Sequence, residues 1–154
     1  MKGHTSGINS VSFSPDGTQI ITGSNDCLAI IWDALTCKIW ESLKGHLRFI
    51  RTCCFSSDGK LIATGGDDDF VIIWDAKSLK KITIFKLYTN DNYSSCFSPD
   101  NKSIVTASYD NAAIIWDVKT EACIGEPLKG HSYPIRSVCF SPDGKKIVTG
   151  SGDW

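Results

Sequence analysis

Short apolar runs alternate with polar turn signals along the whole chain. In the first part of the sequence, four runs rich in apolar and β-branched residues predict strands over 8–14, 19–24, 28–33 and 37–43. We find no helical pattern of useful length in the sequence. The alternation of strands and turns therefore predicts an all-β protein.

The turn between the first two of these strands has a specific composition. Residues 14–17 read Ser-Pro-Asp-Gly, in which Pro fixes the φ that begins a tight turn and Gly supplies the positive φ that the turn needs. The same four residues recur at 141–144. Ser57 replaces the Pro in the second copy and Asn101 replaces the Gly in the third. We expect both turns to form, because Asn tolerates the left-handed conformation well.

The whole pattern repeats about every 42 residues. Each repeat has a Phe at the end of its first strand, and the first three contain Ile-Ile-Trp-Asp at 30–33, 72–75 and 114–117. The phenylalanines are Phe13, Phe55, Phe97 and Phe140, at spacings of 42, 42 and 43 residues. A unit of this size cannot bury both faces of its sheet alone, so neighbouring units must cover them. Radial stacking around a channel is the economical arrangement for such units.

The repeated motifs resemble those of the WD-repeat β-propellers across essentially the whole chain. They are Gly-His, Phe-Ser-Pro-Asp-Gly, Thr-Gly-Ser-x-Asp and Ile-Ile-Trp-Asp. The resemblance implies a partial propeller over 1–154, with three complete four-stranded antiparallel blades plus the inner two strands of a fourth. We place the blades at 3–44, 45–86, 87–129 and 130–154.

These blades are too few to close a ring, which takes about 4 to 8. We therefore expect a ring that this chain does not close, with open sheet edges and bare blade faces. We interpret the chain as a fragment of a longer WD-repeat protein, and the alternative is association of two copies. Either the remaining blades of a longer chain or a second copy would be needed to close the ring.

His, Thr, Asp and Trp recur at fixed places in the repeat. The sets are His4, Thr22, Asp26 and Trp32; His46, Thr64, Asp68 and Trp74; Thr106, Asp110 and Trp116; and His131, Thr149 and Asp153. Together His, Thr and Asp could suggest a hydrolase triad, but an active site is not normally built several times at equal intervals, and a triad needs an activated nucleophile and an oxyanion site. In the resembled family these positions form a hydrogen-bonded tetrad, a buried polar network that would stabilise each blade. We therefore expect no catalytic residues and no enzymatic activity.

The third and fourth repeats depart from this pattern. Leu87 and Tyr88 stand where the third repeat should have Gly-His. We expect a formed but less rigid third blade, with Asp110 solvated or bonded to Tyr88 or to the backbone. Trp154 comes five residues before the position of the expected Trp, so we do not count it as a tetrad member.

The composition argues against some classes of protein but does not indicate a function. The 154 residues are 42% apolar and 21% charged, with a formal net charge of −1, as in an ordinary soluble globular chain. This charge gives little of the electrostatic footprint that phosphate binding needs, so we do not favour nucleic acid as a partner. Because the longest apolar runs have the length of strands, we expect no membrane segment and a cytoplasmic or nuclear location.

The cysteines do not indicate a disulfide framework or a metal site. There are seven, an odd number, and none forms a Cys-x-x-Cys pair. We therefore predict no metal and no cofactor. Cys54, Cys96 and Cys139 each precede the Phe of their repeat, which predicts a column of small buried side chains on equivalent strands.

Candidate partner-binding residues follow from the resemblance. In the resembled family, partners often contact positions three and five places after the His and one place before the tetrad Asp, on the narrow top rim of the propeller. Among the residues at these positions we favour Phe49, Arg51, Tyr93, Tyr109 and Arg136. Arg, Tyr and exposed Phe are enriched at binding hot spots, although single residues of this kind also occur on ordinary surfaces.

These observations predict a non-catalytic scaffold that binds peptide or protein partners on its top rim. One alternative is an RNA-binding propeller subunit, which the near-neutral charge supports poorly. Another is a substrate receptor of a ubiquitin ligase. Family members with that role carry Trp-Asp-x-Arg, whereas Leu35, Lys77 and Lys119 stand at the Arg position here.

Overall fold

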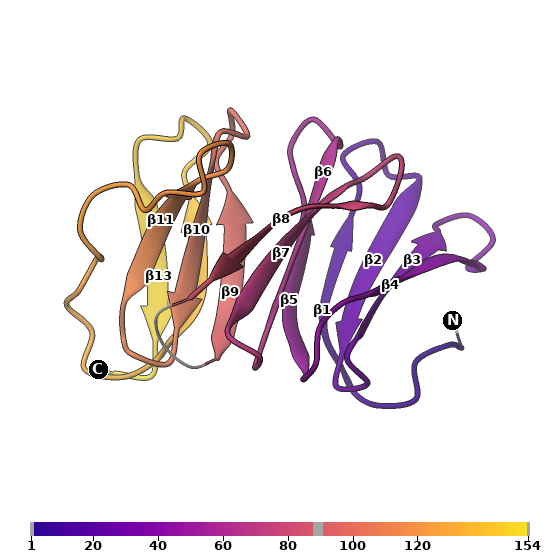
Figure 1. Cartoon of the computed structure of the whole chain (residues 1–154), viewed down its shortest axis with the longest axis horizontal. Helices are drawn as coiled ribbons and strands as arrows, with labels where there is room; N and C mark the ends of the chain where they lie inside the picture. Colours follow the sequence, from indigo (N-terminus) through magenta and orange to yellow (C-terminus); the bar gives the residue numbers. More distant parts are fainter. Residues whose placement is uncertain (1, 88–90, 154) are drawn as a thin grey trace.

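Every regular element of the structure, a computed structural model that describes residues 2–87 and 91–153, is a β-strand. In chain order the strands are β1 (Ile8–Phe13), β2 (Gln19–Ser24), β3 (Leu28–Asp33), β4 (Ile39–Lys44), β5 (Ile50–Phe55), β6 (Leu61–Gly66), β7 (Phe70–Asp75), β8 (Lys81–Lys86), β9 (Asn92–Phe97), β10 (Ser103–Ser108), β11 (Ala113–Asp117), β12 (Ile135–Phe140) and β13 (Ile147–Ser151). They form antiparallel sheets in the orders β1-β2-β3-β4, β5-β6-β7-β8, β11-β10-β9 and β12-β13 (Figure 1). In these residues we find no helix with the length and hydropathy that a membrane crossing requires.

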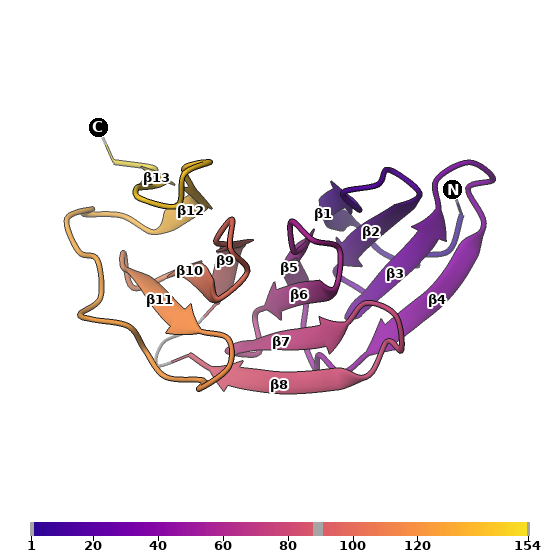
Figure 2. The same cartoon turned by 90° about the horizontal axis from the view of Figure 1, so that it is seen from above.

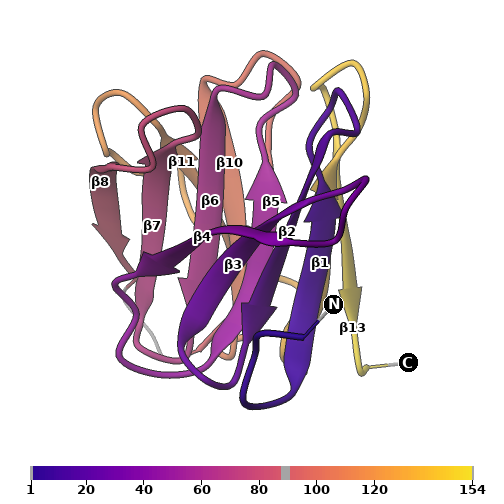
Figure 3. The same cartoon turned by 90° about the vertical axis from the view of Figure 1, so that its right-hand side faces the viewer.

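The sheets stand side by side in an arc, which is the arrangement of propeller blades. Seen from above, β1, β5, β9 and β12 lie on the concave side of the arc, and β4 and β8 lie on its convex side (Figure 2). Viewed from the end that carries the first sheet, the blades stand one behind another (Figure 3). The chain is thus an all-β partial propeller, and its ring is open.

The predicted strands of the first blade form with small changes at their ends. The first strand ends at Phe13 rather than at residue 14, and the last begins at Ile39 rather than Cys37. Cys37 instead has a positive φ of 56°, and its N–H donates to the carbonyl of Asp33 at 2.9 Å. That hydrogen bond closes a turn, which delays the start of the strand.

The tight turns between the first two strands of each blade are confirmed. Gly17, Gly59 and Gly144 have φ values of 71°, 70° and 70°, and Asn101 takes the same left-handed conformation with a φ of 59°. In the second turn, where Ser57 replaces Pro, the Gly59 N–H still donates to the Ser56 carbonyl at 2.9 Å. The turn therefore depends on the residue with positive φ more than on the proline.

The third blade differs from the expected four strands. Within the described residues its sheet has three strands, and only the isolated bridges Ala113–Leu128 and Trp116–Cys123 stand in place of a fourth. The segment between those bridges contains Gly125, with a φ of 72°, and Pro127, which has no N–H to donate to a ladder. These two residues explain why the outer strand is interrupted.

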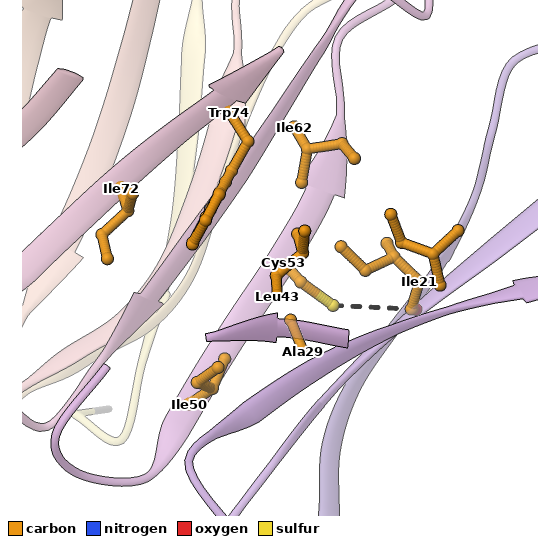
Figure 4. Packing of buried hydrophobic residues seen from close by; sticks show 9 residues of the cluster. Ile21, Ala29, Leu43, Ile50, Cys53, Ile62, Ile72 and Trp74 are labelled. Atoms are coloured by element: carbon orange, nitrogen blue, oxygen red, sulfur yellow. Dashed lines mark hydrogen bonds between the residues drawn. The ribbon is translucent and has the colours of Figure 1, made fainter. Parts of the chain in front are cut away.

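The hydrophobic core lies between neighbouring sheets. Ile21 of the first blade packs with Ile50, Ile62 and Trp74 of the second, and each of these side chains is 3% exposed or less (Figure 4). A second cluster, which includes Ile73 and Ile104, joins the second blade to the third in the same way. Each blade is therefore stabilised mainly by the face of the next one.

Hydroxyl groups also link the inner strands of adjacent blades. The Cys53 N–H donates to Ser10 Oγ at 3.1 Å, and the Ser95 N–H donates to Thr52 Oγ1 at 3.2 Å. The Val138 N–H donates to Ser94 Oγ at 3.2 Å. The acceptors occupy one repeat position, so the same polar link recurs at each of these blade boundaries.

The two ends of the arc leave apolar side chains exposed. On β1, Ile8 is 54% exposed, Val11 63% and Phe13 62%, and on β13 Val148 is 66% exposed. The predicted burial of the cysteine column is wrong for Cys139, which is exposed, whereas Cys54 and Cys96 are partly buried. The reason is that, in the described part of the chain, no further sheet covers β12.

Candidate functional site

In the second blade, four side chains form a continuous chain of hydrogen bonds. Trp74 Nε1 donates to Thr64 Oγ1 at 2.9 Å, and Thr64 Oγ1 lies 2.9 Å from His46 Nε2. His46 Nδ1 lies 2.9 and 3.0 Å from the two carboxylate oxygens of Asp68. A neutral imidazole with its proton on Nδ1 satisfies every member, because Nε2 then accepts the hydroxyl proton of the threonine.

Equivalent contacts occur in the first and fourth blades. In the first, His4 lies 2.9 Å from Asp26 and 2.7 Å from Thr22, which accepts from Trp32 Nε1 at 2.8 Å. The fourth blade has His131 Nδ1 2.9 Å from Asp153 and His131 Nε2 2.8 Å from Thr149. Trp154, which we do not count as a member, lies outside the described residues.

The third blade contains only part of this network. Trp116 Nε1 donates to Thr106 Oγ1 at 2.9 Å, as in the other blades. Asp110 is exposed, accepts a hydrogen bond from the Ser108 hydroxyl, and lies 3.4 Å from the Ala112 backbone N–H. Tyr88, which we considered as a partner of Asp110, lies outside the described residues.

Amide hydrogen exchange tests the effect of this difference on rigidity. We expect amides of β9–β11 to exchange at least about tenfold faster than those of β5–β7, because the described residues of the third blade contain neither the His bridge nor a regular outer strand. Mass spectrometry of peptides from the two blades measures the rates within one sample. Equal protection would mean that the histidine adds nothing to blade rigidity.

The tetrad carboxylates are held in their charged form. Burial would raise the pKa of Asp68, but hydrogen bonds from His46 and from the backbone N–H groups of Leu47 and Phe70 outweigh it, so its pKa lies below the ordinary 3.8. The same balance lowers the pKa of Asp26. For Asp153, the hydrogen bond from the Ser132 N–H is the largest cause of a lowered pKa. Each carboxylate therefore serves as a hydrogen-bond acceptor at neutral pH.

Arg51, Tyr93 and Arg136 share one structural position, a β-bulge near the start of the inner strand. In β5 the pairing with β6 shifts between Ile50 and Thr52, so Arg51 has no partner across the ladder. The ladders of β9 and β12 skip Tyr93 and Arg136 in the same way. A bulge re-aims its extra side chain, and here it turns the same position of successive blades away from the regular pleat.

The five candidate partner-binding residues form two groups of neighbouring side chains. One group crosses the boundary between the third and fourth blades, and the other lies in the second blade. The Arg136 guanidinium lies 4.2 Å from the centre of the Tyr93 ring, and the Tyr93 and Tyr109 rings are 6.4 Å apart. The Arg51 guanidinium lies 5.4 Å from the Phe49 ring centre. Phe49 is 43% exposed and Tyr109 55%. We call the surface formed by these five residues the rim surface.

The sequence of the chain matches a known family of repeats. A family model described as "WD domain, G-beta repeat" matches residues 1–33, 37–75, 82–117 and 121–154. The chain belongs to the WD40 family. Each internal WD40 match begins at the outer strand of one blade and ends with the third strand of the next, as in 37–75, which contains β4 to β7. A single sequence repeat therefore joins two blades covalently.

Solved WD40 structures share the fold. The structure titled "Structure of U3-55K" superposes with a TM-score of 0.85 at 23% identity, over 90% of this chain and 44% of that one. "Crystal structure of RRP9 WD40 repeats" gives the same TM-score and identity, over 90% of this chain and 43% of that one. This chain thus spans less than half of either. In a comparison with curated proteins, no sequence matches significantly.

A hollow of about 370 Å³ lies beside one half of the rim surface of this WD40 chain. It is lined by Cys27, Leu47, Arg48, Phe49, Asp67 and Asp91. Leu47 is 82% exposed, and we did not single out Leu47 or Arg48 from the sequence. Their position directly after the tetrad His46, in the loop that leads to β5, was the available signal.

Charge in this hollow is partly compensated. Arg51 donates to both carboxylate oxygens of Asp67, at 2.7 and 2.6 Å, which raises the arginine's pKa. Burial, then the nearby Asp67 charge, raises the pKa of Asp91. Across the part of the chain that the structure describes, no group of three or more His, Cys, Asp or Glu residues is arranged to hold a metal ion.

Proposed function

We propose that this WD40 chain is a non-catalytic scaffold that binds peptide or protein partners through the rim surface. WD40 domains mediate protein interactions, and WD40 propellers are typically non-catalytic scaffolds. The observation that carries the proposal is the repeated bulge, which gives Arg51, Tyr93 and Arg136 equivalent positions on neighbouring inner strands. These residue types desolvate well and have few competing rotamers when stacked, as binding hot spots require.

The tetrad residues support a structural role and not catalysis. Thr64, the only hydroxyl in the second tetrad, is fully buried between Trp74 and His46, so it is not open to a substrate. The first and fourth blades contain the same contacts at equal intervals. We therefore assign these His, Thr, Asp and Trp residues to the stabilisation of single blades.

Nucleic acid binding is the less supported alternative. Arg51, one of the cations it would use, is already paired with Asp67, and the chain has a formal net charge of −1. A neutralised cation releases few counterions from a phosphate backbone, so Arg51 adds little to such binding. We propose a cytoplasmic or nuclear location for the scaffold.

The double variant Tyr93→Ala/Arg136→Ala tests the rim surface. It removes the stacked pair without touching the buried core, so we expect an unchanged Tm and at least about a tenfold loss of partner binding. Affinity purification followed by quantitative mass spectrometry measures the loss against the unmodified chain. Partners first identified in that comparison are then measured as purified proteins.

A matched control lies at the start of the outer strand β4, with Lys38 just before it and Trp40 within it. Lys38→Ala/Trp40→Ala also removes one exposed cation and one exposed aromatic ring, the latter 60% exposed. We expect this variant to keep the partners that the rim variant loses. Equal binding by all three proteins would refute the rim assignment.

A further inference from the structure

Two thiols meet across the boundary between the third and fourth blades. Cys96 on β9 and Cys139 on β12 occupy equivalent places in the repeat, and their Sγ atoms lie 3.6 Å apart. Cys54, the preceding member of this column, has its Sγ 3.6 Å from the carbonyl oxygen of Ser95 instead. The close sulfur–sulfur approach is thus a property of the last two members of the column.

The surroundings of the two thiols differ in a way that suits oxidation. Cys139 is exposed and can meet a solute, whereas Cys96 is partly buried beside it. Cys54 and Cys96 also line a hollow of about 300 Å³ that reaches Phe140 and Pro142. A disulfide needs its sulfur atoms about 2.0 Å apart, so the two Sγ atoms, already in van der Waals contact, must approach by about 1.6 Å.

We propose that Cys96 and Cys139 form a site of reversible thiol oxidation, which reacts with small-molecule disulfides of the glutathione class and joins the third and fourth blades covalently. The site does not depend on the rim surface or on any bound partner.

The reaction is two successive thiol–disulfide exchanges. The Cys139 thiolate attacks one sulfur of the small disulfide and forms a mixed disulfide with it. The S–S bond of the small disulfide breaks, and the other small thiolate leaves and takes up a proton. Cys96 then loses its proton to water, and its thiolate attacks the Cys139 sulfur of the mixed disulfide, which expels the second small thiolate. Two protein thiols are oxidised and one small disulfide is reduced to two thiols.

The order of these steps follows from the structure. Burial, followed by the contact with Cys139, raises the pKa of Cys96 above its ordinary 9.0, so Cys96 is the poorer first nucleophile. Once the mixed disulfide has formed on Cys139, the short sulfur–sulfur distance favours the second exchange as an intramolecular step. The new bond closes a loop between residues 43 positions apart and holds the two-stranded fourth sheet to the rest of the chain.

Oxidised glutathione tests the proposal directly. The reduced 154-residue chain is incubated with it and quenched with acid; one portion is examined by intact mass, and another is alkylated with iodoacetamide for peptide mapping. Apart from glutathione adducts on the exposed Cys37 and Cys123, we expect a monomer that has lost two hydrogen atoms, a cross-linked peptide pair containing Cys96 and Cys139, and a Tm several degrees higher. Reduction with dithiothreitol should restore the original mass and Tm.

Three single variants separate the two roles. Cys96→Ser should accumulate a stable glutathione adduct on Cys139, and Cys139→Ser should give no cross-link at Cys96. Cys123→Ser, which removes another exposed thiol, should leave the cross-link unchanged. A wild-type chain that keeps glutathione on Cys139 with Cys96 free, or that joins Cys96 to Cys54, or that forms dimers through Cys139, would overturn the proposal.

Discussion

Replacing Asp68 by alanine should lower the free energy of unfolding by about 3 kcal/mol, because it removes the buried acceptor of a charge-assisted hydrogen-bond network. The Asp68 side chain is 5% exposed, and it accepts hydrogen bonds from His46 Nδ1 and from the backbone N–H of Leu47 at 2.8 Å. Without it, both donors lose their partner, and the imidazole of His46 does so in a buried place that water hardly reaches. Urea denaturation, with the m-value checked for constancy, measures the change.

The third blade provides the matched control. Asp110 occupies the same repeat position, but it is exposed, contacts Ser108 and Ala112, and has no histidine partner. We expect Asp110→Ala to lower the free energy of unfolding by less than a third of the Asp68 effect. Equal losses at the two positions would show that the carboxylate acts through its local turn and that the His–Thr–Trp chain adds nothing.

Acid should diminish the contribution of Asp68. Burial opposes its ionisation, but the hydrogen bonds from His46 and from the Leu47 N–H lower the pKa of Asp68 in the folded state below 3.8. A carboxyl with a depressed folded-state pKa stabilises the fold above its unfolded pKa, and this stabilisation is lost as the pH falls through the folded value. The difference in stability between the wild type and Asp68→Asn should therefore be constant near neutrality and should shrink below about pH 4. A difference that grows with acidity would contradict this assignment.

The repeated sequence predicted most of the fold because each local signal has a local cause. The Ser-Pro-Asp-Gly turn and its Asn101 variant fix φ within four residues, and the strands between such turns are too short for any other element. The His, Thr and Asp side chains that the WD-repeat resemblance groups together lie within hydrogen-bond distance in the first, second and fourth blades, whereas Asp110 of the third blade bonds elsewhere. Their contacts follow from strand register, which the turns determine.

The features that the sequence did not predict depend on what covers a residue or on backbone detail. Cys139 is followed by the same Phe-Ser-Pro-Asp as Cys96, yet it is exposed because no sheet stacks beyond β12 in the described residues. The bulge that re-aims Arg51 has no marker in the residue pattern, since Ile50 and Thr52 look like any strand residues. The interruption of the outer strand in the third blade has only a local signal in the sequence, namely Gly125 and Pro127 within that segment.

Replacing Ile50 by alanine should destabilise the chain by about 2 to 5 kcal/mol, because it opens a cavity between the first and second blades. Ile50 is fully buried and packs with Ile21, Ile62 and Trp74, which belong to both sheets (Figure 4). Chemical denaturation of the variant measures the loss. Since the core of this protein lies between blades, the variant should weaken the stacking of two sheets more than either sheet itself.

Ile8 supplies the comparison, since it occupies the same repeat position in the first blade and is 54% exposed. We expect Ile8→Ala to change the free energy of unfolding by less than about 1 kcal/mol, as surface substitutions do. The ratio of the two effects therefore reports whether the face of the first blade is open in solution. A loss at Ile8 as large as that at Ile50, and dependent on protein concentration, would mean that a second copy covers this face, whereas equal and concentration-independent losses would contradict the open arc.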